Sequence, residues 1–177
     1  MSPLSALTAA RAPSLGPVSS KPPTTAATTA LMRLGIAFTA HPYRHDPATR
    51  AYGEEAAAVL GLDPAVVFKT LVADVDGRLV TAVVPVAGRL DLRALAGAVG
   101  GKHAVLAEPA VAERRTGYVL GGISPVGQRQ RLPTVLDATA LAFDRIYVSG
   151  GRRGFDIGLA PTDLLRATGG STAEIAR

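Results

Sequence analysis

Two valine-rich runs in the middle of the chain, separated by a turn dipeptide, give the clearest pattern of apolar and polar positions. Residues 66–75 and 78–86 are rich in β-branched side chains, and Asp76-Gly77 joins them. Asp-Gly suits a two-residue turn with positive φ, so the two runs are predicted to form a β-hairpin. Lys69 lies inside the first run and is therefore predicted to lie on a paired strand.

Helical spacing alternates with short apolar runs along the rest of the chain. Acidic residues at the start and glycine at the end favour a helix over residues 53–61, and proline in the first turn favours another over residues 109–115. The other predicted helices cover residues 28–34, 91–99 and 161–168, and the other predicted strands cover residues 36–40, 103–106, 134–136, 145–149 and 155–159.

This interleaving of short strands and helices predicts a mixed α/β fold, a mixed sheet with flanking helices. The chain has 177 residues, which suits one domain, and it shows no internal repeat. Residues 1–27 are rich in Ser, Pro, Ala and Thr, which predicts a disordered extension ahead of a single domain over residues 28–177. Because no apolar stretch suits a secretory signal or a membrane span, a cytoplasmic protein without a membrane partner is expected.

The positive charge of the chain is unevenly distributed. The formal net charge is +5, and residues 111–153 hold seven arginines against Glu113, Asp137 and Asp144, a local net charge of +4. This bias favours a polyanionic partner such as nucleic acid. A general preference for arginine would give the same pattern, so charge by itself does not decide the function.

Cysteine and histidine usage narrows the chemistry. The chain has no cysteine, which excludes a disulfide framework, a cysteine metal site and a protein thiol nucleophile. Its three histidines, His41, His45 and His103, are scattered, so a histidine metal cluster is not expected. No metal and no cofactor are predicted.

Lys69 is an unusual residue for its position. The chain contains three lysines against sixteen arginines, and this lysine lies in an apolar run, where burying an ammonium is costly without a partner or ligand. Three explanations fit this position: the ammonium extends to solvent at a strand end, it pairs with a core carboxylate, or it belongs to a binding site. Asp156, which alternates with apolar residues on a predicted strand, would hold Lys69, hold a substrate amine or face solvent.

Two glycine-containing loops, residues 117–128 and 147–154, are further candidates. Neither matches a phosphate-binding or dinucleotide-binding motif, but glycines allow backbone donors to approach a ligand closely. Each loop is equally explained as a tight turn. A serine hydrolase using Ser124 or Ser149 with a histidine is the weaker reading, because nothing in the sequence selects a catalytic triad.

Four stretches together resemble the YbaK/EbsC family of free-standing aminoacyl-tRNA editing proteins, and within it the Cys-tRNA(Pro) deacylase branch. The family is related to the editing domain of bacterial prolyl-tRNA synthetases. The resemblance covers almost everything after residue 27 and implies a largely antiparallel sheet with a pocket for an aminoacyl ester. The four stretches are residues 41–47, Phe68-Lys-Thr-Leu71, residues 116–128 and residues 146–154.

The resemblance also implies which residues form the site. Lys69 falls on the essential lysine of the family, Gly121 on its loop glycine and Tyr43 on a pocket tyrosine. Tyr52 replaces a phenylalanine that is common in the family, which adds a hydroxyl to the pocket wall. The implied catalytic residues are Lys69 and Gly121, and the implied substrate-binding residues are Tyr43, Tyr52, Thr70, Gly122, Ser124, Ser149, Gly150 and Asp156.

The implied reaction is hydrolysis of mischarged Cys-tRNA(Pro), in which the thiol of the substrate attacks its own ester and releases a cyclic thiolactone. The expected partner is the acceptor end of an aminoacyl-tRNA, with a prolyl-tRNA synthetase complex as a further candidate and no DNA. Lys69 is expected to act electrostatically. The alternatives are a broader or alanine-specific deacylase that uses water, a non-catalytic tRNA-binding or synthetase-binding module, and a small-molecule domain with an anion-binding lysine.

Overall fold

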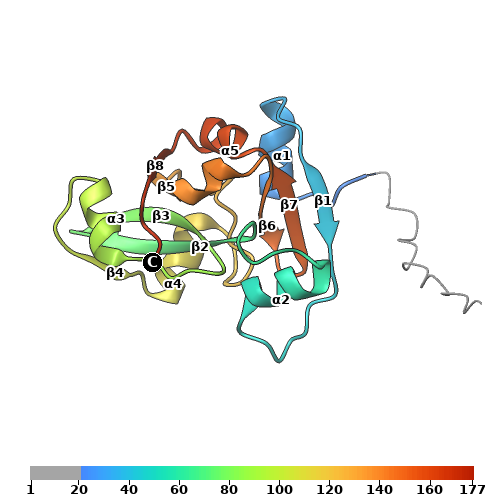
Figure 1. Ribbon diagram of the computed structural model, residues 1–177, viewed down its shortest axis with the longest axis horizontal. Helices are drawn as coiled ribbons and strands as arrows, with labels where there is room; N and C mark the ends of the chain where they lie inside the picture. The colour runs from blue at the N-terminus through green and yellow to red at the C-terminus, as the bar shows by residue number, and fades with distance from the viewer. Residues whose placement is uncertain (1–20) are drawn as a thin grey trace, which may run out of the picture.

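A computed structural model describes residues 21–177, which form two β-sheets lying side by side with helices around them (Figure 1). The three-stranded sheet is antiparallel and has the order β1-β7-β6, with β1 at Thr39–Pro42, β6 at Ile146–Arg152 and β7 at Phe155–Leu159. The five-stranded sheet is mixed and has the order β4-β2-β3-β5-β8, with β2 at Phe68–Val75, β3 at Arg78–Pro85, β4 at Ala104–Leu106, β5 at Thr134–Asp137 and β8 at Ser171–Ala173.

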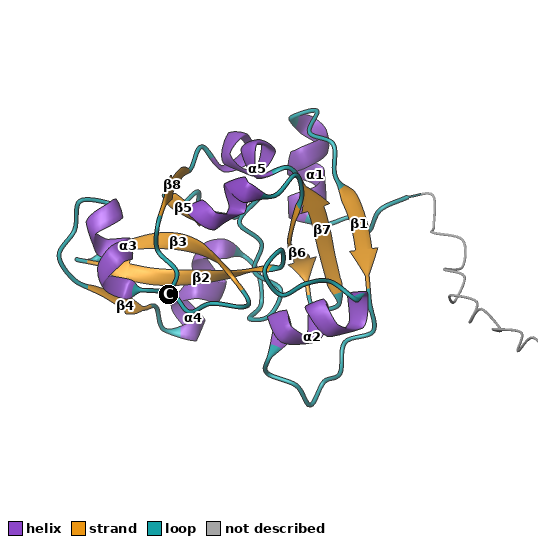
Figure 2. Ribbon diagram, in the orientation of Figure 1, coloured by secondary structure: helices purple, strands orange, loops and turns teal. Residues whose placement is uncertain are grey.

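The helices lie on the outer faces and at the ends of the sheets (Figure 2). They are α1 at Ala26–Arg33, α2 at Tyr52–Leu60, α3 at Leu92–Ala98, α4 at Pro109–Thr116, the 3-10 helix η1 at Ala138–Ala142 and α5 at Pro161–Thr168. In residues 21–177, no helix is long and apolar enough to cross a membrane.

The predicted hairpin is confirmed. β2 and β3 pair antiparallel from Phe68↔Pro85 to Val75↔Arg78, and the turn between them takes positive φ at both Asp76 and Gly77. Asp74 Oδ1 also accepts a 2.7 Å hydrogen bond from the Gly77 N–H. The local turn chemistry therefore fixes the register of the strand that carries Lys69.

The side chains of the hairpin alternate between two apolar clusters, as the two-residue period of a strand requires. Val83 packs into the larger cluster, which lies between the two sheets and also contains Phe155 and Ile157 of β7. Val80 and Val84 pack into the second cluster with Leu95 of α3. β3 is consequently buried on both faces, and the core rigidly supports the strand next to it, β2.

The mixed α/β class is confirmed, but the strands divide between two sheets where one had been expected. The parallel pairs β3·β5 and β5·β8 make the larger sheet mixed, and only the smaller sheet is wholly antiparallel. β8 and η1 were not predicted. Ser171–Ala173 carries no apolar alternation, so its pairing with β5 depends on tertiary contacts and leaves no local signal.

The prediction was wrong at the junction of α1 and β1, where a strand over residues 36–40 had been expected. Gly35 takes φ 65°, and the N–H groups of Gly35 and Ile36 donate to the carbonyls of Met32 and Leu31. This is a Schellman motif, in which the apolar residue after the glycine closes the helix end. Ile36 is buried as part of that cap, and the strand begins three residues later, at Thr39.

α1 also begins earlier than predicted. Thr25 and Thr28 form a reciprocal capping box, in which each side chain bonds the backbone N–H of the other, so the helix starts at Ala26. The expected disordered extension ended at residue 27, inside this helix. Its first 20 residues lie outside the described residues.

Candidate active site

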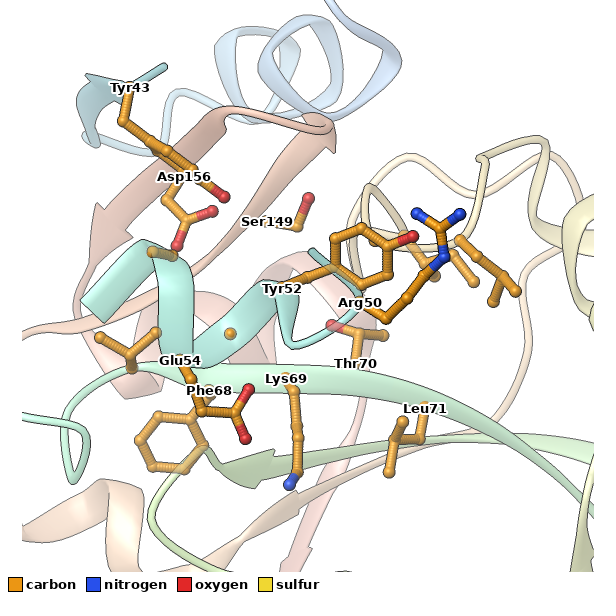
Figure 3. Close-up of a pocket in the computed structure, with 16 residues that line it drawn as sticks. Tyr43, Arg50, Tyr52, Glu54, Phe68, Lys69, Thr70, Leu71, Ser149 and Asp156 are labelled. Carbon is orange, nitrogen blue, oxygen red and sulfur yellow. The ribbon is translucent and has the colours of Figure 1, made fainter. Parts of the chain in front are cut away.

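A cavity of about 250 Å³ opens where α2, β2 and the strands of the smaller sheet meet. Ligand pockets for drug-sized molecules begin near 300 Å³, so this cavity suits a group smaller than a drug-sized molecule. Figure 3 shows how its side chains converge from segments far apart in the sequence. Its lining is Tyr43, Arg50, Tyr52, Gly53, Glu54, Ala56, Val67, Phe68, Lys69, Thr70, Leu71, Leu120, Gly121, Ile123, Ser149 and Asp156.

The ring of Tyr52, the first residue of α2, forms one wall of the cavity and lies directly against Gly121. A Cβ atom added to Gly121 would lie 2.6 Å from the Tyr52 ring, and Gly121 also takes φ 81°. Both facts require glycine at this position, because a side chain would collide with the ring and strain the backbone. Gly121 therefore permits close approach between the 117–128 loop and α2.

Thr70 and Lys69 leave β2 on opposite faces (Figure 3). The Thr70 hydroxyl lies beneath the Tyr52 ring, is buried, and has no hydrogen-bond partner. The Lys69 ammonium donates a 2.9 Å hydrogen bond to the carbonyl of Gly88. One sequence-based expectation was that Lys69 pairs with a core carboxylate. Among residues 21–177, its ammonium bonds the Gly88 carbonyl instead, and no carboxylate lies within 4.0 Å of it.

A carboxyl group faces the cavity from the smaller sheet. Asp156 of β7 is opposite Ser149 of β6 in the strand register, and only 6% of Asp156 is exposed. Desolvation by burial raises the pKa of Asp156 to about 7. The pKa of Tyr43 is also raised, mainly by burial and to a smaller extent by the negative charges of Asp156 and Glu55. The Tyr43 side chain points toward Asp156.

A hydrogen-bonded acid holds the loop that carries Tyr43 against the start of α2. One oxygen of Glu55 lies 2.7 Å from His45 Nδ1, and the other accepts a 2.6 Å hydrogen bond from the Asp46 N–H. The His45 ring lies 5.7 Å from the ring of Tyr52. Glu55 thus ties together the two segments that supply the tyrosines of the cavity.

Three of the residues predicted for the site do not line the cavity. Ser124 is fully buried, and its hydroxyl accepts from the Val126 N–H. Gly122 lies where a Cβ would be 2.8 Å from Arg152 Cα, and Gly150 lies where a Cβ would be 2.4 Å from the Phe155 ring. These glycines allow the two glycine-containing loops to pack against each other and against the core.

A serine triad is not assembled among residues 21–177. The hydrogen bonds of the histidine side chains pair His41 with Thr39 and His45 with Glu55. Ser149 Oγ instead accepts from the Gly151 N–H at 3.3 Å. Together with the absence of cysteine from the chain, this leaves the cavity without an activated protein nucleophile.

Sequence reasoning missed two charged residues of the lining, Arg50 and Glu54. Both lie within two positions of Tyr52 at the start of α2, and that proximity is the signal that could have found them. Seven of the ten predicted site residues do line the cavity: Tyr43, Tyr52, Lys69, Thr70, Gly121, Ser149 and Asp156.

Comparisons with known proteins show the family of the chain. Residues 46–167 match the family model described as an aminoacyl-tRNA editing domain. Over 124 residues, 69% of this chain and 75% of the relative, the chain is 41% identical to a protein of Enterococcus faecalis named as a candidate Cys-tRNA(Pro)/Cys-tRNA(Cys) deacylase, EbsC.

Solved structures show the same fold. A structure described as a candidate trans-editing enzyme for prolyl-tRNA synthetase superposes with a TM-score of 0.76 at 27% identity, covering 86% of this chain and 95% of that one. A hypothetical protein named APE2540 superposes with a TM-score of 0.78 at 27% identity, covering 86% of this chain and 100% of that one. The chain therefore belongs to the aminoacyl-tRNA editing domain family.

Proposed function

We propose that this protein is an aminoacyl-tRNA deacylase that removes cysteine mischarged onto tRNA(Pro). Membership of the editing family supports the deacylase reaction, and the 41% identity to EbsC supports cysteine as the amino acid. The observation that carries the mechanism is a cavity with groups that can bind and polarise an ester but without a protein nucleophile. The attacking group then comes from the substrate or from water.

In the proposed step, the cysteinyl thiol attacks the carbonyl carbon of its own ester. A C–S bond forms, the bond from the carbonyl carbon to the ribose oxygen breaks, and the thiol proton passes to that ribose oxygen. The products are tRNA with a free hydroxyl and a cyclic thiolactone, which water then opens to cysteine. No oxidant and no protein thiol take part.

Two groups of β2 fit the ester in this proposal. The buried, unpartnered hydroxyl of Thr70 offers a hydrogen bond to the substrate without breaking one within the protein. Lys69 lines the cavity from the other face of β2, so its side chain swings away from the Gly88 carbonyl to bring the ammonium to the ester, where it stabilises negative charge developing on the carbonyl oxygen. Both act by position and charge, and neither forms a covalent intermediate.

Asp156 receives the α-ammonium of the aminoacyl group in this proposal. An ammonium beside a buried carboxyl favours the ionised form, so substrate binding lowers the pKa of Asp156 from its value of about 7. The free enzyme then binds substrate better as Asp156 ionises. This arrangement accounts for a buried carboxyl group that faces the cavity.

Selection of the tRNA is proposed to involve prolyl-tRNA synthetase as a partner. The cavity holds an aminoacyl group and has no room for distant parts of a tRNA. The structural similarity to a candidate trans-editing enzyme for that synthetase supports the choice of partner.

A deacylation panel tests the proposed function. Purified protein is mixed with Cys-, Ala- and Pro-tRNA(Pro) and with Cys-tRNA(Cys), each with and without prolyl-tRNA synthetase. The proposal predicts rapid loss of cysteine from tRNA(Pro) and little loss of proline. Preferential loss of alanine would support the water-using alternative, and tRNA binding without any deacylation would support a non-catalytic module.

A further inference from the structure

Two arginines lie beside Tyr52 at the cavity. Arg50 is exposed, lines the cavity, and extends alongside the Tyr52 ring (Figure 3). The guanidinium of Arg153 lies 5.3 Å from the centre of the same ring. The two residues come from the segment before α2 and from the turn after β6, so the fold brings them together.

Each arginine is positioned by neutral oxygen atoms. Arg153 Nε donates a 2.8 Å hydrogen bond to the carbonyl of Leu120, and Arg50 Nη1 donates to the carbonyls of Pro47 and Thr49 at 3.2 and 3.3 Å. In residues 21–177, the ion pairs within 4.0 Å are His45–Glu55 and Arg166–Asp163, so neither arginine faces a carboxylate at that distance. Their positive charges are held in place and are not neutralised.

We propose that Arg50 and Arg153 form a clamp that binds backbone phosphates of the single-stranded 3′ end of tRNA. This inference rests on the proposed function, because it assumes that an aminoacyl ester occupies the cavity. The ester joins the terminal ribose, and the phosphate of the same nucleotide lies only a ribose ring away. A ligand whose ester enters the cavity therefore brings phosphate groups to the cavity mouth.

The chemistry of the two side chains fits phosphate. A guanidinium presents several N–H donors in a planar fork that matches phosphate oxygens, and it stays charged at every physiological pH. Stacking of Arg153 on Tyr52 orients that fork while leaving its Nη donors available. Lys69 leaves β2 on the other face and bonds Gly88, so the arginines are the cations that flank Tyr52.

Salt dependence gives a direct test of the clamp. Binding of uncharged tRNA(Pro) is measured as a function of salt for the wild type, Arg50→Gln, Arg153→Gln and the double variant. For single-stranded nucleic acid, each lost phosphate contact reduces the slope of log K against log salt by about 0.7. In each single variant, the slope is expected to decrease by about 0.7 and the affinity to decrease about tenfold. In the double variant, the slope is expected to decrease by about twice as much.

Two controls separate a phosphate clamp from a general loss of charge or of structure. Arg33→Gln removes an exposed positive charge from the end of α1, away from the cavity lining, and is expected to keep the wild-type slope. Arg50→Lys keeps the charge and is expected to recover most of the slope. If Arg153→Gln fails to fold in thermal denaturation, Arg50→Gln carries the test by itself.

A second substrate distinguishes failure of the clamp from failure of the proposed function. Cysteinyl-adenosine carries the ester but no phosphate, so Arg50→Gln and Arg153→Gln should each lower the ratio of kcat/KM for Cys-tRNA(Pro) to kcat/KM for cysteinyl-adenosine by about tenfold. Unchanged tRNA kinetics and salt slopes in an otherwise active enzyme would overturn the clamp. A wild type that hydrolyses neither substrate would overturn the proposed function.

Discussion

Thr70 and Lys69 are adjacent on β2, yet their polar groups are satisfied very differently. The Lys69 ammonium bonds the Gly88 carbonyl, whereas the Thr70 hydroxyl is buried without a partner. A buried hydroxyl without a hydrogen bond costs about 1–3 kcal/mol of stability. The fold gains nothing visible from this hydroxyl, so a ligand is the simplest reason for its presence.

Replacing Thr70 with valine should separate stability from activity. Valine keeps the β-branched shape and removes the unpartnered hydroxyl, so the free energy of unfolding is expected to stay the same or rise by about 1 kcal/mol. Deacylation of Cys-tRNA(Pro) is expected to fall at least tenfold, because the substrate loses a hydrogen bond. Urea denaturation and single-turnover kinetics measure the two effects, and a variant with full activity would remove Thr70 from the site.

Replacing Lys69 with alanine should reduce the rate of deacylation about 10²- to 10³-fold, which is the usual cost of losing one donor that stabilises developing charge. The loss of one hydrogen bond to Gly88 should lower the free energy of unfolding by only about 1–3 kcal/mol. Lys102→Ala is the matched control, because Lys102 is exposed and does not line the cavity. A folded, fully active Lys69→Ala protein would contradict the proposed role.

Much of the site could be predicted because its residues lie in short, spaced motifs. Lys69 stood out as a lysine in an apolar run, and its neighbour Thr70 belongs to the same stretch. Gly121 was expected to supply a backbone donor, and the structure adds a steric reason, the close approach of the Tyr52 ring. Arg50 was missed although it lies two residues before Tyr52 in the sequence, because its place in the cavity lining depends on segments that meet only in the folded chain.

At the scale of elements, α2 and the loop before it behave as one unit because Glu55 bonds both His45 and the Asp46 N–H. That loop carries Tyr43, and α2 begins at Tyr52. The position of both tyrosines therefore depends on one carboxylate that lies outside the cavity lining. Glu55 acts as a positioning residue in this account.

Replacing Glu55 with alanine should loosen the loop. Two hydrogen bonds are lost, one to a backbone N–H, so the free energy of unfolding is expected to fall by about 1–3 kcal/mol. KM for Cys-tRNA(Pro) should rise more than kcat falls, because substrate binding is disturbed while Lys69 and Thr70 remain in place. Glu174→Ala, at an exposed position near the C-terminus, should change neither, and equal behaviour of the two variants would contradict the positioning role.

The helices and strands that could be predicted are those whose ends are determined by nearby residues in the sequence. The Asp76-Gly77 turn determined the hairpin, and proline and glycine marked the ends of α4 and α5. β8 could not be predicted, because its place beside β5 depends on long-range packing. The predicted strand does not begin at residue 36, because Ile36 completes the C-terminal cap of α1. A search for apolar runs does not detect such a cap.

In the whole molecule, Asp156 is poorly solvated because it faces the cavity that the two sheets and α2 enclose, and only 6% of it is exposed. Phe155 and Ile157, its neighbours along β7, point to the opposite face and are fully buried in the larger apolar cluster. Burial raises the pKa of Asp156 to about 7, whereas an unfolded aspartate titrates near 3.8. Between these values the folded protein binds more protons than the unfolded one, so stability from this group is lost as pH rises.

The contribution of Asp156 to stability should therefore fall between about pH 4 and pH 7 and then level off. At 1.36 kcal/mol for each unit of pKa, Asp156 contributes at most about 4 kcal/mol to this decrease. In Asp156→Asn the decrease should be much smaller, because the amide does not titrate. Denaturation at several pH values measures the difference, and parallel pH profiles for the two proteins would show that Asp156 is not the responsible group.

The proposed mechanism requires the substrate to supply the attacking group. This requirement can be tested by a single-turnover comparison of Cys-tRNA(Pro) with Ser-tRNA(Pro), because the two aminoacyl groups differ only in sulfur against oxygen. Cysteine should be released far faster than serine, and a thiolactone should be trapped from the cysteine reaction. Equal rates for the two substrates, with no trapped thiolactone, would contradict it and indicate attack by water.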